Sequence, residues 1–228
     1  MRVALLSEGG TDAVRRAAAG GAEVICLPQL SFLPYLPAVL DRAGLERAER
    51  PPARSYRDAL EAAAGAWLAA SAYESEGEGV FYATAMLGRV GADPPLRHRQ
   101  RRLDARPGRY EPLLLSPGHE APGTCALPWG PTGVLIGPDV ADPASWAQLA
   151  ARGARVVIGG VSATADEWDG LRGAVGALAA RHRIAAFLAA RGGEEHGLRF
   201  AGAGAAWDGN GAELAPGDDG FFELEGTR

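Results

Sequence analysis

The chain has 228 residues, of which 47% are hydrophobic, and its formal net charge at pH 7 is −5. This composition is sufficient for one buried core, and we expect a single domain over residues 1–228. The charges are dispersed without a basic stripe, and no apolar stretch is long enough to cross a bilayer. The sequence therefore excludes nucleic acid and membrane as expected partners, and the absence of a leader-like segment after Met1 favours a cytoplasmic location.

The residue types that bind metals or attack carbonyl carbons are scarce in this chain. Cys26 and Cys125 are the two cysteines, and neither has a second ligand at the spacing of a metal site. The four histidines are equally scattered, so we expect neither a metal nor a cofactor. All 23 basic residues are arginine. No mechanism that needs a lysine amine is therefore open to this chain.

The first half of the chain begins with a predicted β-α-β unit and continues into a hairpin. The predicted strands are 3–7, 23–27, 67–73 and 80–87, and the predicted helices are 11–19 and 56–64. Thr11 is a candidate N-cap of the first helix, and the acidic turn 74–79 joins the last two strands. The loop 31–37 follows a strand at the end where α/β folds tend to place their sites.

The second half alternates strands with helices and ends in short strands. The predicted strands are 96–103, 133–136, 155–158, 184–190, 198–201, 205–208 and 221–224, and the predicted helices are 143–152 and 164–183. Pro143 suits a first helical turn, and Thr164 followed by Glu167 matches a capping box. This mixture of helices and hairpins favours a mixed sheet, or two sheets stacked between helices.

Several segments, taken in order along the chain, resemble the motifs of the nitrilase superfamily of carbon–nitrogen hydrolases. Residues 20–30, GGAEVICLPQL, resemble a hydrophobic strand that ends in Pro-Glu, and residues 98–103, HRQRRL, resemble an aromatic-Arg-Lys-x-His-Leu motif. Residues 133–139, GVLIGPD, resemble Gly-x-x-Ile-Cys-Tyr-Asp. Further matches lie at 110–118, 188–193 and 200–211. The resemblance spans nearly the whole chain and implies an α/β fold, the four-layer α-β-β-α sandwich of the nitrilase type.

The resemblance also implies a catalytic triad, which this sequence does not carry. In the family, a cysteine attacks an amide or nitrile carbon, a glutamate moves its proton and a lysine stabilises the developing negative charge. The matching positions hold Gly137, Gln29 and Gln100, respectively. Glycine offers no nucleophile, and a glutamine side chain neither takes a thiol proton near pH 7 nor carries a positive charge.

The sequence offers no convincing replacement for the missing nucleophile or cation. Strand alternation places Cys26 on the face opposite Gln29, and Cys125 lies beyond a proline-rich turn from the third motif. Neither cysteine is expected to act as a nucleophile. An arginine near an oxyanion cannot serve as a proton donor. We expect the arginines of the second motif, Arg99 and Arg101, to pair with Glu111, with Asp104 or with solvent.

Two acidic residues of the motifs are retained. Glu111 matches a further glutamate that in the family lies near the lysine, and two interpretations of it stay open: a loop brace that accepts backbone N–H groups, or a polar group that keeps a ligand pocket available. Asp139 matches the aspartate of the third motif and is expected to cap or brace the loop before Pro143. Ala190 and Gly204 stand where the family has Asn and Ser, which indicates that supporting hydrogen bonds are missing as well.

These observations favour a catalytically inactive member that binds a small amide or carboxylate ligand, or a protein partner. The candidate pocket residues are Gln29, Gln100, Glu111, Gly137 and Asp139. A second hypothesis is a hydrolase or lyase of carbon–nitrogen bonds, in which Glu111 has a raised pKa and activates water. A third is a structural or regulatory subunit of a hetero-complex. The family resemblance also implies a homodimer through helices 143–152 and 164–183.

Overall fold

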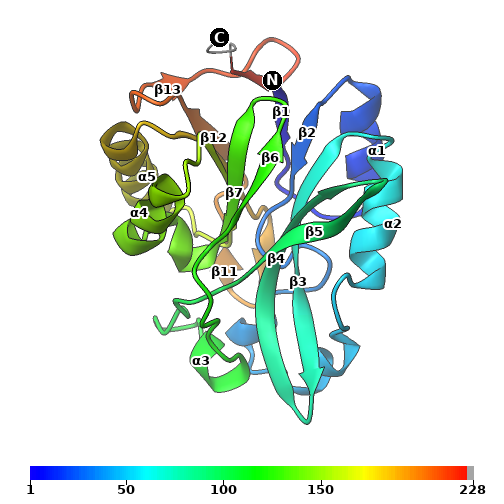
Figure 1. Cartoon of the computed structure of the whole chain (residues 1–228). Coiled ribbons are helices and arrows are strands. Elements are labelled where there is room, and N and C mark those ends of the chain that lie inside the picture. Colours follow the sequence, from blue (N-terminus) through cyan, green and yellow to red (C-terminus); the bar gives the residue numbers. More distant parts are fainter. Residues whose placement is uncertain (225–228) are drawn as a thin grey trace.

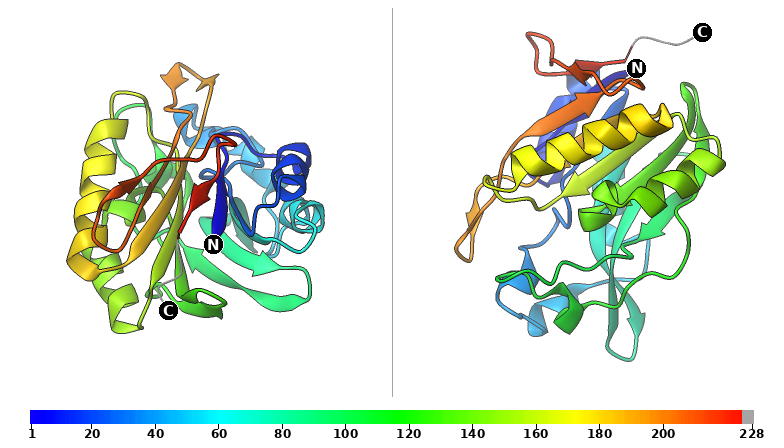
Figure 2. Two further views of the ribbon diagram at one scale, coloured as in Figure 1. Left: turned by 90° about the horizontal axis from the view of Figure 1, so that it is seen from above. Right: turned by 90° about the vertical axis from the view of Figure 1, so that its left-hand side faces the viewer.

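Two six-stranded sheets are stacked face to face between two layers of helices (Figure 1). The computed structural model describes residues 1–224, without the side chains of residues 93 and 94. Seen from above in Figure 2, the blue and cyan helices lie on one side of the paired sheets and the yellow and green helices on the other. The predicted four-layer α-β-β-α sandwich is confirmed.

The first sheet has the strand order β14-β1-β2-β3-β4-β5. Its strands are β1 (Arg2–Leu5), β2 (Val24–Cys26), β3 (Trp67–Gly77), β4 (Val80–Arg89), β5 (Ala92–Arg99) and β14 (Phe222–Glu223). Strands β1, β2 and β3 are parallel, whereas β3, β4 and β5 form an antiparallel meander. The predicted hairpin is confirmed, with Leu68 opposite Gly88 and Ser75 opposite Phe81.

The second sheet has the order β13-β12-β9-β8-β7-β6. Its strands are β6 (Thr124–Leu127), β7 (Gly130–Ile136), β8 (Val156–Val161), β9 (Ala185–Ala190), β12 (Gly204–Trp207) and β13 (Glu213–Leu214), and the short strands β10 (Glu194–Glu195) and β11 (Leu198–Arg199) pair separately. Strands β7, β8 and β9 are parallel. Both sheets thus have parallel central strands. The carboxyl ends of these strands lie at the same edge of the sandwich.

Helices cover the outer face of each sheet, and the apolar core is divided among the layers. Helices α1 (Thr11–Ala19) and α2 (Arg54–Ala62) pack on the first sheet, and α4 (Pro143–Ala151) and α5 (Trp168–His182) pack on the second. Strand alternation separates the layers, because Cys26 lies between the sheets while Ile25 contacts the layer of α1 and α2. Within residues 1–224, no helix has both the length and the apolar character that a membrane crossing requires.

Several sequence predictions differ from the structure at element ends. Helix α5 begins at Trp168 and not at 164. The backbone N–H of Thr164 donates to the Glu167 carboxylate at 2.9 Å, as in a capping box, but residues 165–167 form a turn and Thr164 forms an isolated bridge with Phe200. Thr11 makes no cap hydrogen bond, since Gly10 is the N-cap of α1. The predicted strand 96–103 ends at Arg99. Strands β6, β10 and β13 were not predicted.

Helix α4 begins at a side-chain cap that the sequence analysis did not identify. The carboxylate of Asp142 accepts hydrogen bonds from the backbone N–H of Ser145 at 2.9 Å and from its hydroxyl at 2.8 Å. Burial alone raises the pKa of Asp142, but the hydrogen bonds from Ser145 and the charge of Arg102 outweigh it and leave this pKa below its usual value. The N-terminal end of α4 is therefore fixed by Asp142.

We expect the Asp142→Ala substitution to lower the free energy of unfolding by about 1 kcal/mol, because it removes the N-cap of α4. Asparagine caps as well as aspartate does, so Asp142→Asn should lower it by only a few tenths of a kcal/mol. Because the pKa of Asp142 is lowered on folding, the difference between wild type and Asp142→Ala should shrink as the pH falls below about 4. Urea denaturation across pH measures this, and equal losses in both variants would contradict the cap.

Candidate functional site

The candidate site lies at the edge of the sandwich where strands of both sheets end. Gln29 follows β2, Gly137 follows β7 and begins the 3-10 helix η3 (Gly137–Ala141), and Ser162 follows β8. Gln100 comes directly after β5, and Glu111 begins the short helix α3 (Glu111–Leu114). The packing of the two sheets brings these five residues, distant in the sequence, to one place.

The three positions that resemble the family triad are in contact with one another. The side-chain amide of Gln29 donates from Nε2 to Oε1 of Gln100 at 2.9 Å. A Cβ atom built on Gly137 would lie 2.8 Å from Gln29 Nε2 and 2.9 Å from Gln100 Oε1, which is closer than real Cβ contacts come. The two glutamine side chains therefore occupy the space that any side chain at position 137 would need.

Glu111 is fully buried and holds both glutamines. Its Oε1 accepts from Gln29 Nε2 at 3.0 Å and from the hydroxyl of Tyr35 at 2.8 Å, and its Oε2 accepts from Gln100 Nε2 and from the backbone N–H of Asp104, both at 2.6 Å. Burial raises the pKa of the Glu111 carboxyl, while these donors act in the opposite direction. Each carboxylate oxygen already accepts two hydrogen bonds, so none is left to bind a water molecule.

Asp139 fixes the segment that follows β5. It is fully buried, and it accepts hydrogen bonds from the backbone N–H groups of Arg101 and Arg102, each at 2.8 Å. These backbone groups bond to Asp139 instead of a neighbouring strand, which explains why β5 ends at Arg99. Asp139 also pairs with Nε2 of the buried His98 at 2.8 Å. Asp139 thus braces the loop before Pro143 against the segment that follows β5. It does not cap α4, whose N-cap is Asp142.

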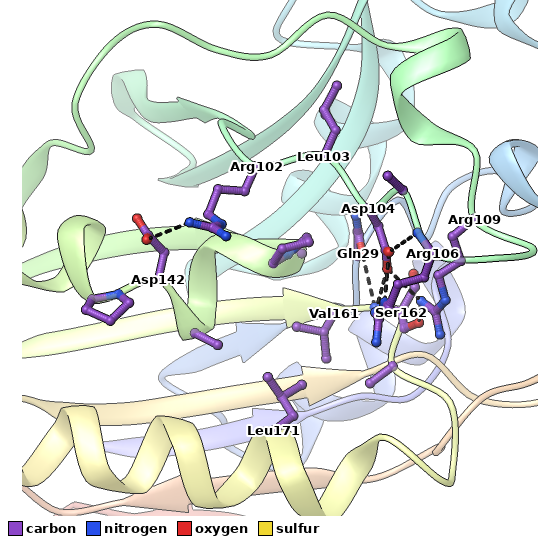
Figure 3. Close-up of a pocket in the computed structure, with 16 residues that line it drawn as sticks. Gln29, Arg102, Leu103, Asp104, Arg106, Arg109, Asp142, Val161, Ser162 and Leu171 are labelled. Carbon is purple, nitrogen blue, oxygen red and sulfur yellow. Dashed lines mark hydrogen bonds and ion pairs between the residues drawn. The ribbon is translucent and has the colours of Figure 1, made fainter.

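A cavity of about 620 Å³ opens beside these residues (Figure 3). Of the predicted pocket residues, Gln29 and Gly137 line it, whereas Gln100, Glu111 and Asp139 lie behind them. The other lining residues are Arg102, Leu103, Asp104, Ala105, Arg106, Arg109, Pro138, Ala141, Asp142, Pro143, Val161, Ser162, Ala163 and Leu171. The loop after β5 thus contributes the charged wall, which the sequence analysis missed because the run of arginines carried no recognisable spacing.

Two of the arginines in the cavity wall are neutralised by a shared pair of carboxylates. Arg106 contacts Asp104 at 2.9 Å and Glu167 at 2.6 Å. Arg109 is buried, contacts Glu167 at 2.6 Å and Asp104 at 3.5 Å, and donates to the backbone carbonyl of Ser162. This four-membered charge network joins the loop after β5 to the start of α5, and it leaves no net charge of its own.

Neither cysteine lines the cavity. Cys26 lies between the sheets with its Sγ 3.3 Å from the carbonyl oxygen of Gly159, and burial raises its pKa to about 12. Cys125 lies on β6, outside the cavity lining, and burial raises its pKa too. A thiol with a raised pKa is a poor nucleophile at neutral pH.

The two motif arginines do not pair with Glu111 or Asp104, the acidic partners that the sequence analysis named. Arg99 contacts the carboxylates of Glu74 at 2.5 Å and Glu76 at 3.2 Å. Arg101 donates to the side chain of Gln148 at 2.9 Å. Neither lines the cavity, and neither reaches Glu111.

The close contact at Gly137 generates a stability prediction. Gly137 has a φ of +55°, and an alanine there carries a backbone cost of about 1–2 kcal/mol. Its Cβ also meets two amides that Glu111 holds in place, which adds about 1–3 kcal/mol. Gly153 has a φ of +72° with open space around a built Cβ, so Gly153→Ala should show only the backbone cost. Urea denaturation compares the two variants, and an equal loss in both would show that the glutamines do not fill this space.

Three comparisons with known proteins show which family and which solved structures the chain is similar to. The profile of the carbon–nitrogen hydrolase family matches residues 8–219. The structure of an amidase from Nesterenkonia sp. AN1 is similar over 94% of this chain and 87% of that chain, with a TM-score of 0.79 and 25% sequence identity. No match is found among curated protein sequences.

Variants of the same amidase are similar to the chain as well. A glutamate-to-glutamine variant, with acrylamide added at the active-site cysteine, has a TM-score of 0.79 and 25% identity over 94% of this chain and 87% of that one. A cysteine-to-alanine variant, described as an amidase of the nitrilase superfamily, has a TM-score of 0.81 and 23% identity over 94% and 85% of the two chains. The family profile covers most of the sequence, and the chain therefore belongs to the carbon–nitrogen hydrolase family.

Proposed function

We propose that this chain binds a small amide or carboxylate in the cavity beside Gln29 and does not hydrolyse it. The observation that carries the proposal is the contact around Gly137, where two side-chain amides fill the space of a nucleophile. Acyl transfer from an amide requires a nucleophile, a base and a group that stabilises the oxyanion. In our proposal, Gly137, Gln29 and Gln100 replace the residues that performed these roles.

The hydrogen bonds of the glutamines support this assignment. Both protons of the Gln29 amide are used, one on Gln100 and one on Glu111, and its Oε1 accepts from the backbone N–H of Ser162 at 3.0 Å. Gln100 donates to Glu111 and to the carbonyl oxygen of Arg102. Neither side chain has a titratable group, and their N–H groups point into the protein. They serve as a wall of the cavity and not as acid, base or oxyanion donor.

The alternative in which Glu111 activates water is not favoured by the geometry. Glu111 is absent from the cavity lining, and Gln29, Gln100, Tyr35 and the backbone of Asp104 already donate to it. A general base has to reach the proton it abstracts directly or through one water molecule. Of the two interpretations that the sequence left open for Glu111, we therefore adopt the brace.

The expected homodimer through residues 143–152 and 164–183 stays a prediction. The outer surface of α4 and α5 exposes small side chains, among them Ala147, Ala174 and Ala177. Such a surface allows close approach of another chain. Helices that pack only on their own sheet expose small side chains as well. The hetero-complex of the third hypothesis likewise stays a prediction.

The proposal is tested by incubating the purified protein with acrylamide, propionamide and an N-carbamoyl amino acid. We expect no ammonia release above a protein-free control and no acyl adduct in the intact mass, because no thiolate faces the cavity. Thermal shift with the same compounds and their acids reports binding. Sustained ammonia release that is lost in Glu111→Gln, with Tyr35→Phe retaining it, would overturn the proposal in favour of Glu111 chemistry.

A further inference from the structure

The cavity wall contains one cation that the protein leaves largely open. Arg106 and Arg109 share the carboxylates of Asp104 and Glu167, as described above. Among the side chains that the structure describes, Arg102 forms a hydrogen bond and ion pair with Asp142 alone, from Nη1 to Oδ1 at 3.3 Å, and its own side chain is 64% exposed. A guanidinium has five N–H donors in a fork, so most of those of Arg102 are available to a ligand.

The backbone of Arg102 is held firmly although its side chain is open. Its N–H donates to Asp139 Oδ1 at 2.8 Å, and its carbonyl oxygen accepts from Gln100 Nε2 at 2.8 Å. Asp139 is fully buried, and Gln100 is anchored on the buried Glu111. The same network that fills the triad-like centre therefore positions Arg102 at the cavity.

Apolar side chains separate Arg102 from the polar end of the cavity. In Figure 3, Arg102 and Asp142 lie at one end, and Gln29 and Ser162 lie at the other. Val161 and Leu171 are placed between these ends, and Pro138, Ala141, Pro143 and Ala163 add further apolar lining. A ligand that reaches Arg102 from within the cavity therefore lays an apolar body against the side chains of Val161 and Leu171.

We propose that the cavity binds a monocarboxylate with a compact apolar body, its carboxylate on Arg102 and its body on Val161 and Leu171. This inference rests on the proposed binding function and names the ligand class. A planar carboxylate matches the guanidinium fork, whereas a neutral amide does not offer two charged acceptors. A dianion is disfavoured because the carboxylate of Asp142 lies beside the same guanidinium. The carboxylate is thus assigned to Arg102, at the end of the cavity opposite Gln29 and Ser162.

The test is calorimetric titration with 3-phenylpropanoate and with its matched primary amide. We expect the acid to bind and the amide to bind about 10-fold more weakly or worse, because a hydrogen bond to a charged group is the stronger one. Arg102→Gln should weaken binding of the acid by about 10-fold and leave binding of the amide unchanged. The control is Arg152→Gln, at the other end of α4 and outside the cavity lining, which should bind the acid as wild type does.

Three results would overturn the inference: no binding of 3-phenylpropanoate at millimolar concentration, equal affinity for acid and amide, or the same loss in Arg102→Gln as in Arg152→Gln. Leu171→Ala leaves Arg102 unchanged and removes apolar contact area. It should therefore weaken binding of both the acid and the amide, and so measures the contribution of the apolar body separately. The proposed function fails by a different observation, release of ammonia from 3-phenylpropanamide. If that occurs, the dependence of acid binding on Arg102 is still measured as product inhibition.

Discussion

The fully buried carboxylate of Glu111 accepts four hydrogen bonds, and the arrangement of the site depends on this interaction. A buried charge is tolerated when hydrogen bonds replace its lost hydration. Two of the donors are the side chains of Gln29 and Gln100, which are thereby fixed against each other and against Gly137. The third and fourth, Tyr35 and the backbone of Asp104, join the loops on both sides of the site.

This network is the basis for proposing that the triad-like centre has a structural role and no catalytic one. A carboxylate saturated by donors has no oxygen free to take a proton from water, and neutral amides provide neither a base nor a full positive charge. The cavity beside it is nevertheless retained, with a volume of about 620 Å³. Its open functional group is Arg102, whose backbone is held by Gln100 and Asp139. The residues that fill the centre thus also position the group that we assign to ligand binding.

Much of the fold was predictable from the sequence because the strand and helix patterns and the order of the motifs point to one architecture. The convergence of Gln29, Gln100 and Gly137 followed from the motif resemblance. The pairing of His98 with Asp139 was not predictable, since the two residues are 41 positions apart and only the packing of β5 on β7 joins them. The charge network of Arg106 and Arg109 was missed for the same reason, because its partner Glu167 lies on another element and was assigned to a capping box.

The central claim is that the scaffold around position 137 is intact while its reactive groups are absent. The most direct measurement restores them together in the variant Gln29→Glu, Gln100→Lys, Gly137→Cys and follows alkylation by fluoroacetamide with peptide mapping. The account predicts labelling at position 137 at least about 10-fold faster than at Cys125, and slower labelling in Gly137→Cys alone, because a base and a cation activate a thiol. A folded triple variant that labels at position 137 no faster than at Cys125 would contradict it.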